Sequence, residues 1–166
     1  MKRLFGSKTT TVPPSPVPSP SDPTSDSIEQ PIRRSLTIPP PRVQDVSAVI
    51  GYSCASSIIS TSLLYALADY IRKSESKCKE TVRAVRKEIK YGSPAAQYRA
   101  FTILGVLARN LDDAGDGFRK EVASKRFLKE IDDCLSNANV DRLVRDVAFR
   151  ILSDLAYSFQ VSLSQT

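Results

Sequence analysis

The side chains best suited to chemistry in this sequence are basic, and they fall within one short stretch. An apolar set there recurs at the spacing of an inward helix face, namely Cys78, Val82, Val85 and Ile89. A second set lies roughly 100° further around the same helix and is cationic: Lys79, Arg83, Arg86, Lys87 and Lys90. Basic residues near an anionic leaflet attract it by about 1 kcal/mol each. The pattern therefore predicts a phosphoinositide site, and the alternative is a solvated outer helix partly neutralised by Glu80 and Glu88.

A second chemical signal lies near the N-terminus, where residues 34–39 read RSLTIP. The pattern Arg-Ser-x-Thr-x-Pro is bound by 14-3-3-type proteins once its threonine is phosphorylated, and here it consists of Arg34, Ser35, Thr37 and Pro39. Such short patterns also recur by chance in chains rich in serine and threonine. We expect a phosphopeptide motif here or a chance match.

Prolines in the same region stand at PxxP spacing, which is typical of SH3 or WW ligands in polyproline II conformation. The pairs are Pro13 with Pro16 and Pro20 with Pro23. Neither pair has a suitably placed flanking arginine. The proline-rich segment is therefore predicted to be a spacer in preference to a docking site.

Other chemistry is missing from the sequence. There is no histidine, so the commonest general base and metal ligand is absent. No phosphate-binding loop or dinucleotide fingerprint occurs either. The acidic stretch at 112–117 resembles a calcium loop, but Ala114 and Ala123 stand where two ligands belong, so a solvated turn is favoured. We expect no enzyme, no metal and no cofactor.

Composition divides the chain of 166 residues into a tail and one domain. Ten of its 11 prolines precede Arg42, so we expect a disordered tail at 1–43, a helical domain at 44–162 and a short tail at 163–166. The net charge of +6 is shared evenly between tail and domain, which gives no reason to expect nucleic acid. Three well-separated cysteines fit reduced thiols, and no secretory or membrane-spanning pattern appears, so a cytoplasmic protein is expected.

Helical periodicity dominates the domain, and no strand pattern competes, so the fold is predicted to be all-α. Helices are expected at 46–57, 60–73, 77–91, 95–111, 118–122, 125–135 and 140–161. Gly92 should end the third helix in a left-handed conformation, and Ser93 with Pro94 should start the next. The last helix should bury one face made of Leu143, Val144, Val147, Ile151, Leu152, Leu155 and Phe159.

These features together resemble the VHS domain over residues 60–160. The resemblance rests on RAVRKEIKYG at 83–92, then Gln97, Phe101, Leu104 and Asn110, and then Phe118 with the stretches at 121–124 and 127–128. The form of the first stretch is similar to that of fungal VHS proteins that act with cortical actin. The resemblance implies a right-handed helical superhelix of the ENTH/VHS superfamily.

The resemblance also implies a non-enzymatic adaptor in endocytosis or endosomal sorting, located at the cell cortex or on endosomes. Family members that bind ubiquitin use a tryptophan and a leucine on the second helix, and the matching positions here are Thr61 and Tyr65. Ubiquitin binding should therefore be weak or absent. The GAT bundle that usually follows is not in this sequence. A scaffold that acts through its tail, or a truncated paralogue, are the alternatives.

Overall fold

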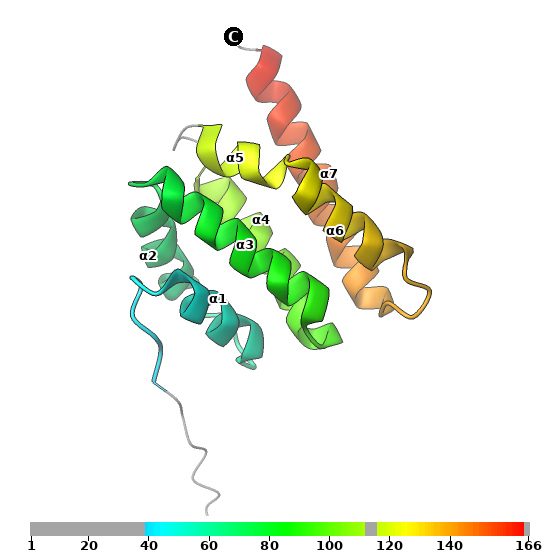
Figure 1. Cartoon of the computed structure of the whole chain (residues 1–166), viewed down its shortest axis with the longest axis horizontal. Coiled ribbons are helices and arrows are strands. Elements are labelled where there is room, and N and C mark those ends of the chain that lie inside the picture. Colours follow the sequence, from blue (N-terminus) through cyan, green and yellow to red (C-terminus); the bar gives the residue numbers. More distant parts are fainter. Residues whose placement is uncertain (1–38, 112–115, 165–166) are drawn as a thin grey trace, which may run out of the picture. The chain divides into compact units, whose positions relative to one another are not determined.

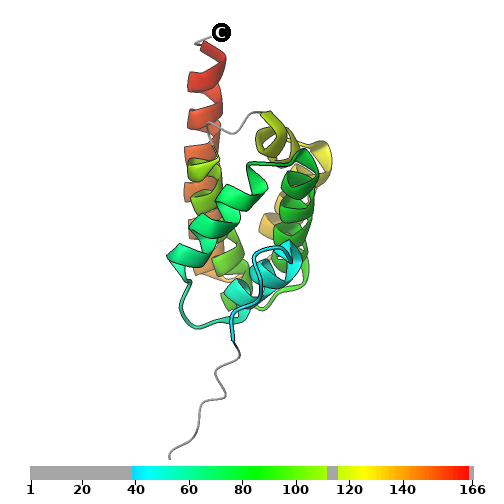
Figure 2. The same cartoon turned by 90° about the vertical axis from the view of Figure 1, so that its left-hand side faces the viewer.

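The computed structural model describes residues 39–111 and 116–164, and every regular element within them is a helix. In chain order these are α1 (Val46–Ala55), α2 (Thr61–Ile71), α3 (Glu75–Tyr91), α4 (Pro94–Asn110), α5 (Asp116–Val122), α6 (Lys125–Ser136) and α7 (Arg142–Ser164). They form two layers, with α1, α3, α5 and α6 in one and α2, α4 and α7 in the other (Figures 1 and 2). The all-α prediction is confirmed.

Helix α4 lies in the middle of its layer, where it packs against α2 and α7, and it also packs against α1 and α3 of the other layer. Its apolar side chains Phe101, Ile103, Leu104 and Leu107 are fully buried, as expected for a helix that is apolar around most of its circumference. Gly105 allows the closest approach to α7: a Cβ atom at this position would lie 2.6 Å from Cδ1 of Ile151. A side chain larger than hydrogen would therefore push Ile151 aside.

Short polar side chains start four of the helices. Asp45, Ser60, Ser93 and Ser124 each accept a hydrogen bond from the backbone N–H three residues further on. Each cap satisfies one of the backbone donors that a helix start leaves without a partner. The predicted start of α4, with Ser93 as the cap and Pro94 as the first helical residue, is confirmed.

Three helix ends are tied down by side chains from other helices. Arg99 of α4 donates to the carbonyl of Cys54 at 2.9 Å, Gln97 of α4 to that of Ile89 at 2.8 Å, and Arg72 after α2 to that of Asn110 at 2.7 Å. The last carbonyls of a helix lack partners within the helix and carry its negative dipole end. These bonds therefore cap α1, α3 and α4, and those of Arg99 and Gln97 join the two layers.

The prediction that Gly92 is left-handed is wrong. Its φ of −71° and ψ of 158° are extended backbone that any residue adopts. Glycine is required here for a different reason: a Cβ atom would lie 2.4 Å from the backbone oxygen of Glu88, to which the N–H of Gly92 donates at 2.9 Å. The tight turn between α3 and α4 leaves no room for a side chain on that side.

The last helix buries most of the face that its sequence predicts. Val144, Val147, Ile151 and Leu155 are buried, and Leu152 is partly buried. Leu143 is a correction, because its side chain is 66% exposed. It borders a hollow of about 650 Å³ between the starts of α4 and α7, and this hollow leaves that side of the first turn uncovered. The side chain of Phe159 lies outside the described residues.

None of the described helices combines the length and the apolar character that crossing a bilayer requires.

Candidate anion-binding groove

Helix α3 presents its basic side to solvent because its other side is fixed by the core. Cys78, Val82, Val85 and Ile89 are buried, which confirms the predicted inward stripe. The helix lies between α1 and α6 in its layer, and it packs against both (Figure 1). The outward side chains of α3 are therefore flanked by these two neighbours.

A hollow of about 370 Å³ lies over this outer side. Arg83, Arg86, Lys87 and Lys90 of α3 line it, together with Ser47 of α1 and with Arg126 and Glu130 of α6. Four of the five basic residues predicted from the sequence thus share one depression. Ala84, Glu88 and Tyr91 of α3 complete the lining, so the hollow combines one side of α3 with parts of two helices that are distant in sequence.

A second, smaller hollow of about 180 Å³ continues from the first. It is lined by Lys79, Val82, Arg83, Arg86, Glu121, Ser124, Arg126 and Phe127. Because both hollows share Arg83, Arg86 and Arg126, we treat them as one feature and name it the basic groove. These three arginines lie at its centre, whereas Lys79 and Lys90 lie toward opposite ends.

Among the described residues, ion pairs with carboxylates occur only at the ends of the basic groove, although Glu88 lines the larger hollow and Glu121 the smaller one. Lys79 pairs with Glu75 at 3.0 Å, and Lys90 pairs with Glu130 at 2.9 Å. These hydrogen bonds to a carboxylate raise the pKa of both lysines, so both remain charged at neutral pH. Of the two glutamates expected to neutralise the face, Glu80 pairs with Lys77 at 2.8 Å, whereas Glu88 lines the larger hollow without forming an ion pair among the described residues.

The central cations keep their charge available. Within the described part of the chain, Arg83, Arg86, Lys87 and Arg126 form no ion pair with a carboxylate. Guanidinium groups are weakly hydrated and present N–H donors in a planar fork that matches phosphate oxygens. Three such groups around one depression are suited to hold a phosphate group by charge-assisted hydrogen bonds.

Arg126 is the member of the groove that the sequence did not reveal. It is the second residue of α6, 36 positions after Lys90, and its place depends on the packing of α6 against α3. The only sequence signal was that a basic residue follows the Ser124 cap. Periodicity within one helix carries no information about which neighbour lies beside it.

The predicted ubiquitin positions lie elsewhere. Thr61 and Tyr65 are one turn apart on α2, in the other layer, and both are exposed, Tyr65 by 52%. Of the predicted phosphopeptide motif, only Pro39 is described, and it is exposed. Arg34, Ser35 and Thr37 lie outside the described residues, as do the PxxP prolines and residues 112–115 of the acidic stretch.

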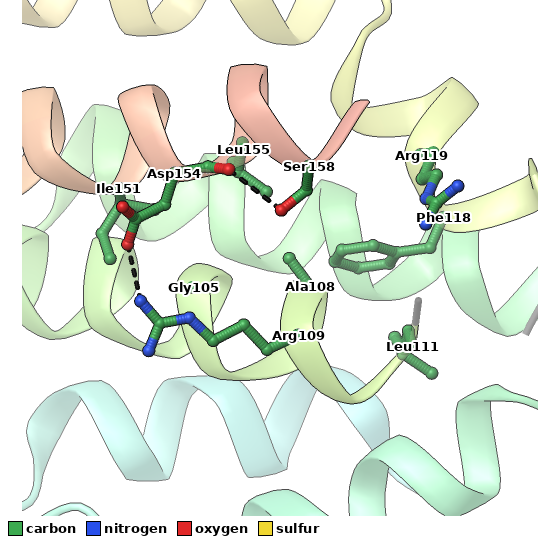
Figure 3. Close-up of a pocket in the computed structure, with 10 residues that line it drawn as sticks. All are labelled: Gly105, Ala108, Arg109, Leu111, Phe118, Arg119, Ile151, Asp154, Leu155 and Ser158. Atoms are coloured by element: carbon green, nitrogen blue, oxygen red, sulfur yellow. Dashed lines mark hydrogen bonds and ion pairs between the residues drawn. The ribbon is translucent and has the colours of Figure 1, made fainter. Parts of the chain in front are cut away.

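A further depression lies between α4, α5 and α7 (Figure 3). It has about 20 Å³ of free space, enough for one water molecule, and its walls include Gly105, Phe118 and Ile151. Arg109 pairs with Asp154 across its rim. This depression is a packing feature between helices and is too small for an organic ligand.

The cysteines are suited to packing more than to reaction. Burial raises the pKa of the Cys54 thiol to about 12, with the charge of Glu88 acting in the same direction and Arg99 opposing it. Burial also raises the pKa values of Cys78 and Cys134. All three are free thiols. No group of three or more metal-ligating side chains occurs among residues 39–111 and 116–164.

Comparison with protein-family models matches residues 41–165 to the VHS domain. Comparisons with curated proteins and with solved structures found no match. VHS domains are adaptor-type binding domains of membrane trafficking and are not enzymes. The match covers most of the chain and includes every helix described above.

Proposed function

Since this chain belongs to the VHS domain family, we propose that it is a trafficking adaptor that docks on phosphoinositide-containing membranes through the basic groove. The observation that carries the proposal is the convergence of Arg83, Arg86 and Arg126 around one depression without carboxylate partners among the described residues. If the outer side of α3 were only a solvated surface, there would be no reason for Arg126 of α6 to lie beside its arginines.

The size and charge of the groove fit an inositol phosphate headgroup. The larger hollow has about 370 Å³ of space, which lies within the range of small-molecule sites. Its lining holds five basic side chains and two carboxylates, Glu88 and Glu130, so its net positive charge favours an anionic ligand over an apolar one. A phosphorylated headgroup would exchange its water shell for the arginine forks.

Vesicle sedimentation tests the proposal. Phosphatidylcholine vesicles with a small fraction of phosphoinositide should bind the chain at least tenfold more tightly than vesicles of phosphatidylcholine alone. Binding should weaken with salt, because the screening length falls from about 10 Å at 0.1 M to about 3 Å at 1 M. Equal binding to both vesicle types would remove the proposal.

We propose the place of action from the VHS family and from the similarity of residues 83–92 to fungal VHS proteins. We expect peripheral association with the cell cortex, beside actin at endocytic sites, or with endosomes. Deleting residues 1–42 separates this from the alternative of a scaffold that works through its N-terminal region, including the predicted 14-3-3-type and SH3 or WW motifs. Localisation that survives the deletion favours the domain, and localisation that is lost favours the N-terminal region.

Ubiquitin is a second candidate ligand because Thr61 and Tyr65 are both exposed on one side of α2. A threonine replaces the large apolar contact that a tryptophan makes in ubiquitin-binding family members, so we expect weak binding at most. Titrating ubiquitin into the isotope-labelled chain while following the amide signals of these two residues tests this. An absence of shifts at high ubiquitin concentration would exclude it.

A further inference from the structure

Ser124 lies inside the basic groove and suggests how the groove is controlled. Its side chain lines the smaller hollow together with Arg83, Arg86 and Arg126. Resting on the function proposed above, we infer that Ser124 is a phosphorylation site whose phosphate occupies the groove and excludes the lipid phosphate. The modification would thus release the domain from the membrane.

The surroundings of Ser124 favour a phosphate group for two independent reasons. The residue caps α6, its hydroxyl accepting from the N–H of Phe127 at 3.3 Å, so an added phosphate would lie at the positive end of a helix of 12 residues. The central arginines of the groove line the same hollow and have no carboxylate partner among the described residues. A phosphate attached to Ser124 would therefore meet donors that are already in place.

The residue also meets the needs of a kinase substrate. Ser124 is partly exposed in the short turn between α5 and α6, and the basic residues Lys125 and Arg126 follow it. The kinase would transfer the γ-phosphoryl group of ATP. The bond from phosphorus to the Ser124 oxygen forms, the bond from phosphorus to the ADP oxygen breaks, and the hydroxyl proton passes to the base of the kinase.

The size of the effect follows from charge. A phosphoserine carries about −1.5 to −2 charges at neutral pH, which offsets roughly two of the basic residues of the groove. With about 1 kcal/mol of membrane attraction per basic residue, vesicle affinity should fall about 30-fold. Direct occupation of the arginine donors can only add to this loss.

The experiment installs phosphoserine at position 124 of the full chain during translation and measures sedimentation with phosphoinositide vesicles. A matched chain carries phosphoserine at position 153, an exposed site on α7, a helix that does not line the groove. Both chains carry the same added charge. We expect about 30-fold weaker binding for the first chain and little change for the second.

Phosphorus NMR gives a readout that does not depend on lipid. The phosphate at position 124 should titrate below the ordinary value of about 6, because the arginines favour its dianion, whereas the phosphate at position 153 should not. Equal titration of the two phosphates overturns the inference, and so does vesicle binding that phosphorylation leaves unchanged. If the unmodified chain binds no vesicles, the proposed function and the switch are both refuted. A lowered pKa of the phosphate at position 124 would in that case still show that this phosphate lies in the groove.

Phosphopeptide mass spectrometry of the protein from its own cells completes the test. Phosphate on Ser124 in samples protected from phosphatases supports the inference. Its absence there, with other phosphosites of the chain detected, would overturn Ser124 as a modification site.

Discussion

Replacing the three central arginines of the groove by glutamine should abolish most membrane binding without unfolding the domain. Arg83, Arg86 and Arg126 form no ion pair among the described residues, so the substitutions leave no buried carboxylate without a partner. Arg83 and Arg126 are exposed and Arg86 is partly exposed, so little packing is lost. Glutamine keeps helix propensity close to that of arginine.

The magnitude follows from counting charges. Three basic residues near an anionic leaflet contribute about 3 kcal/mol in total, and about 1.4 kcal/mol corresponds to a tenfold change in affinity, so binding should weaken roughly 100-fold. A larger loss would indicate direct hydrogen bonds, since bonds to charged groups are worth about 1.5–3 kcal/mol each. Arg126→Gln alone should weaken binding about fivefold.

Vesicle sedimentation at fixed ionic strength measures the effect, and circular dichroism checks that the helices remain. The matched control replaces by glutamine three residues that, like the groove arginines, form no ion pair among the described residues: Arg42, Lys73 and Arg150. These residues are exposed and do not line the groove, and their three substitutions remove the same net charge as the substitutions in the groove. If the control loses as much affinity as the groove variant, general charge attracts the membrane and the reasoning from the groove is refuted.

Three further predictions concern single residues. Glu130→Gln frees Lys90 from its 2.9 Å ion pair and removes a carboxylate from the groove wall, so vesicle affinity should rise about fivefold, and a fall would show that Glu130 serves the ligand. Gly92→Ala places a Cβ atom against the backbone oxygen of Glu88 and should lower the free energy of unfolding by about 1–3 kcal/mol in urea titrations, whereas an unchanged midpoint would contradict the steric account. Burial raises the pKa of Cys54 from 9.0 to about 12, so its thiolate forms more easily in the unfolded chain and the free energy of unfolding should fall as pH rises above 9. Between about pH 8 and pH 11 the urea midpoint of Cys54→Ala should therefore fall less than that of the parent. Urea midpoints that fall equally with pH in both chains would exclude this contribution.

Much of the fold could be predicted from the sequence because nearby residues mark where a helix begins and which of its sides faces the core. Ser93 and Pro94 mark the start of α4, and the spacing of Val82, Val85 and Ile89 marks the inward side of α3. Both signals depend on residues within a few positions of each other. Local spacing was sufficient for them.

Features that depend on a neighbouring helix could not be predicted from local spacing in the sequence. The frequent left-handed glycine at helix ends predicts that conformation for Gly92, but the backbone oxygen of Glu88 and the close start of α4 decide its role. Leu143 follows the periodicity of a buried face, yet no helix covers the first turn of α7 on that side among the described residues. Tertiary surroundings overrode the local pattern in both cases.

The candidate site shows the same division. The basic side of α3 was visible as a helical pattern, but Arg126 and Ser124 enter the groove only because α6 packs against α3. Of the glutamates expected to neutralise this side, Glu80 pairs with Lys77 instead. Glu130, which pairs with Lys90, belongs to α6 and lies 40 residues away in sequence.

The most direct test of the central claim is an NMR titration of the isotope-labelled chain with a soluble inositol phosphate headgroup. The groove account predicts saturable shifts of the amide and guanidinium signals of Arg83, Arg86 and Arg126, with small changes on α2 and α7. Shifts confined to another surface, or no shifts at concentrations that saturate vesicle binding, would contradict it.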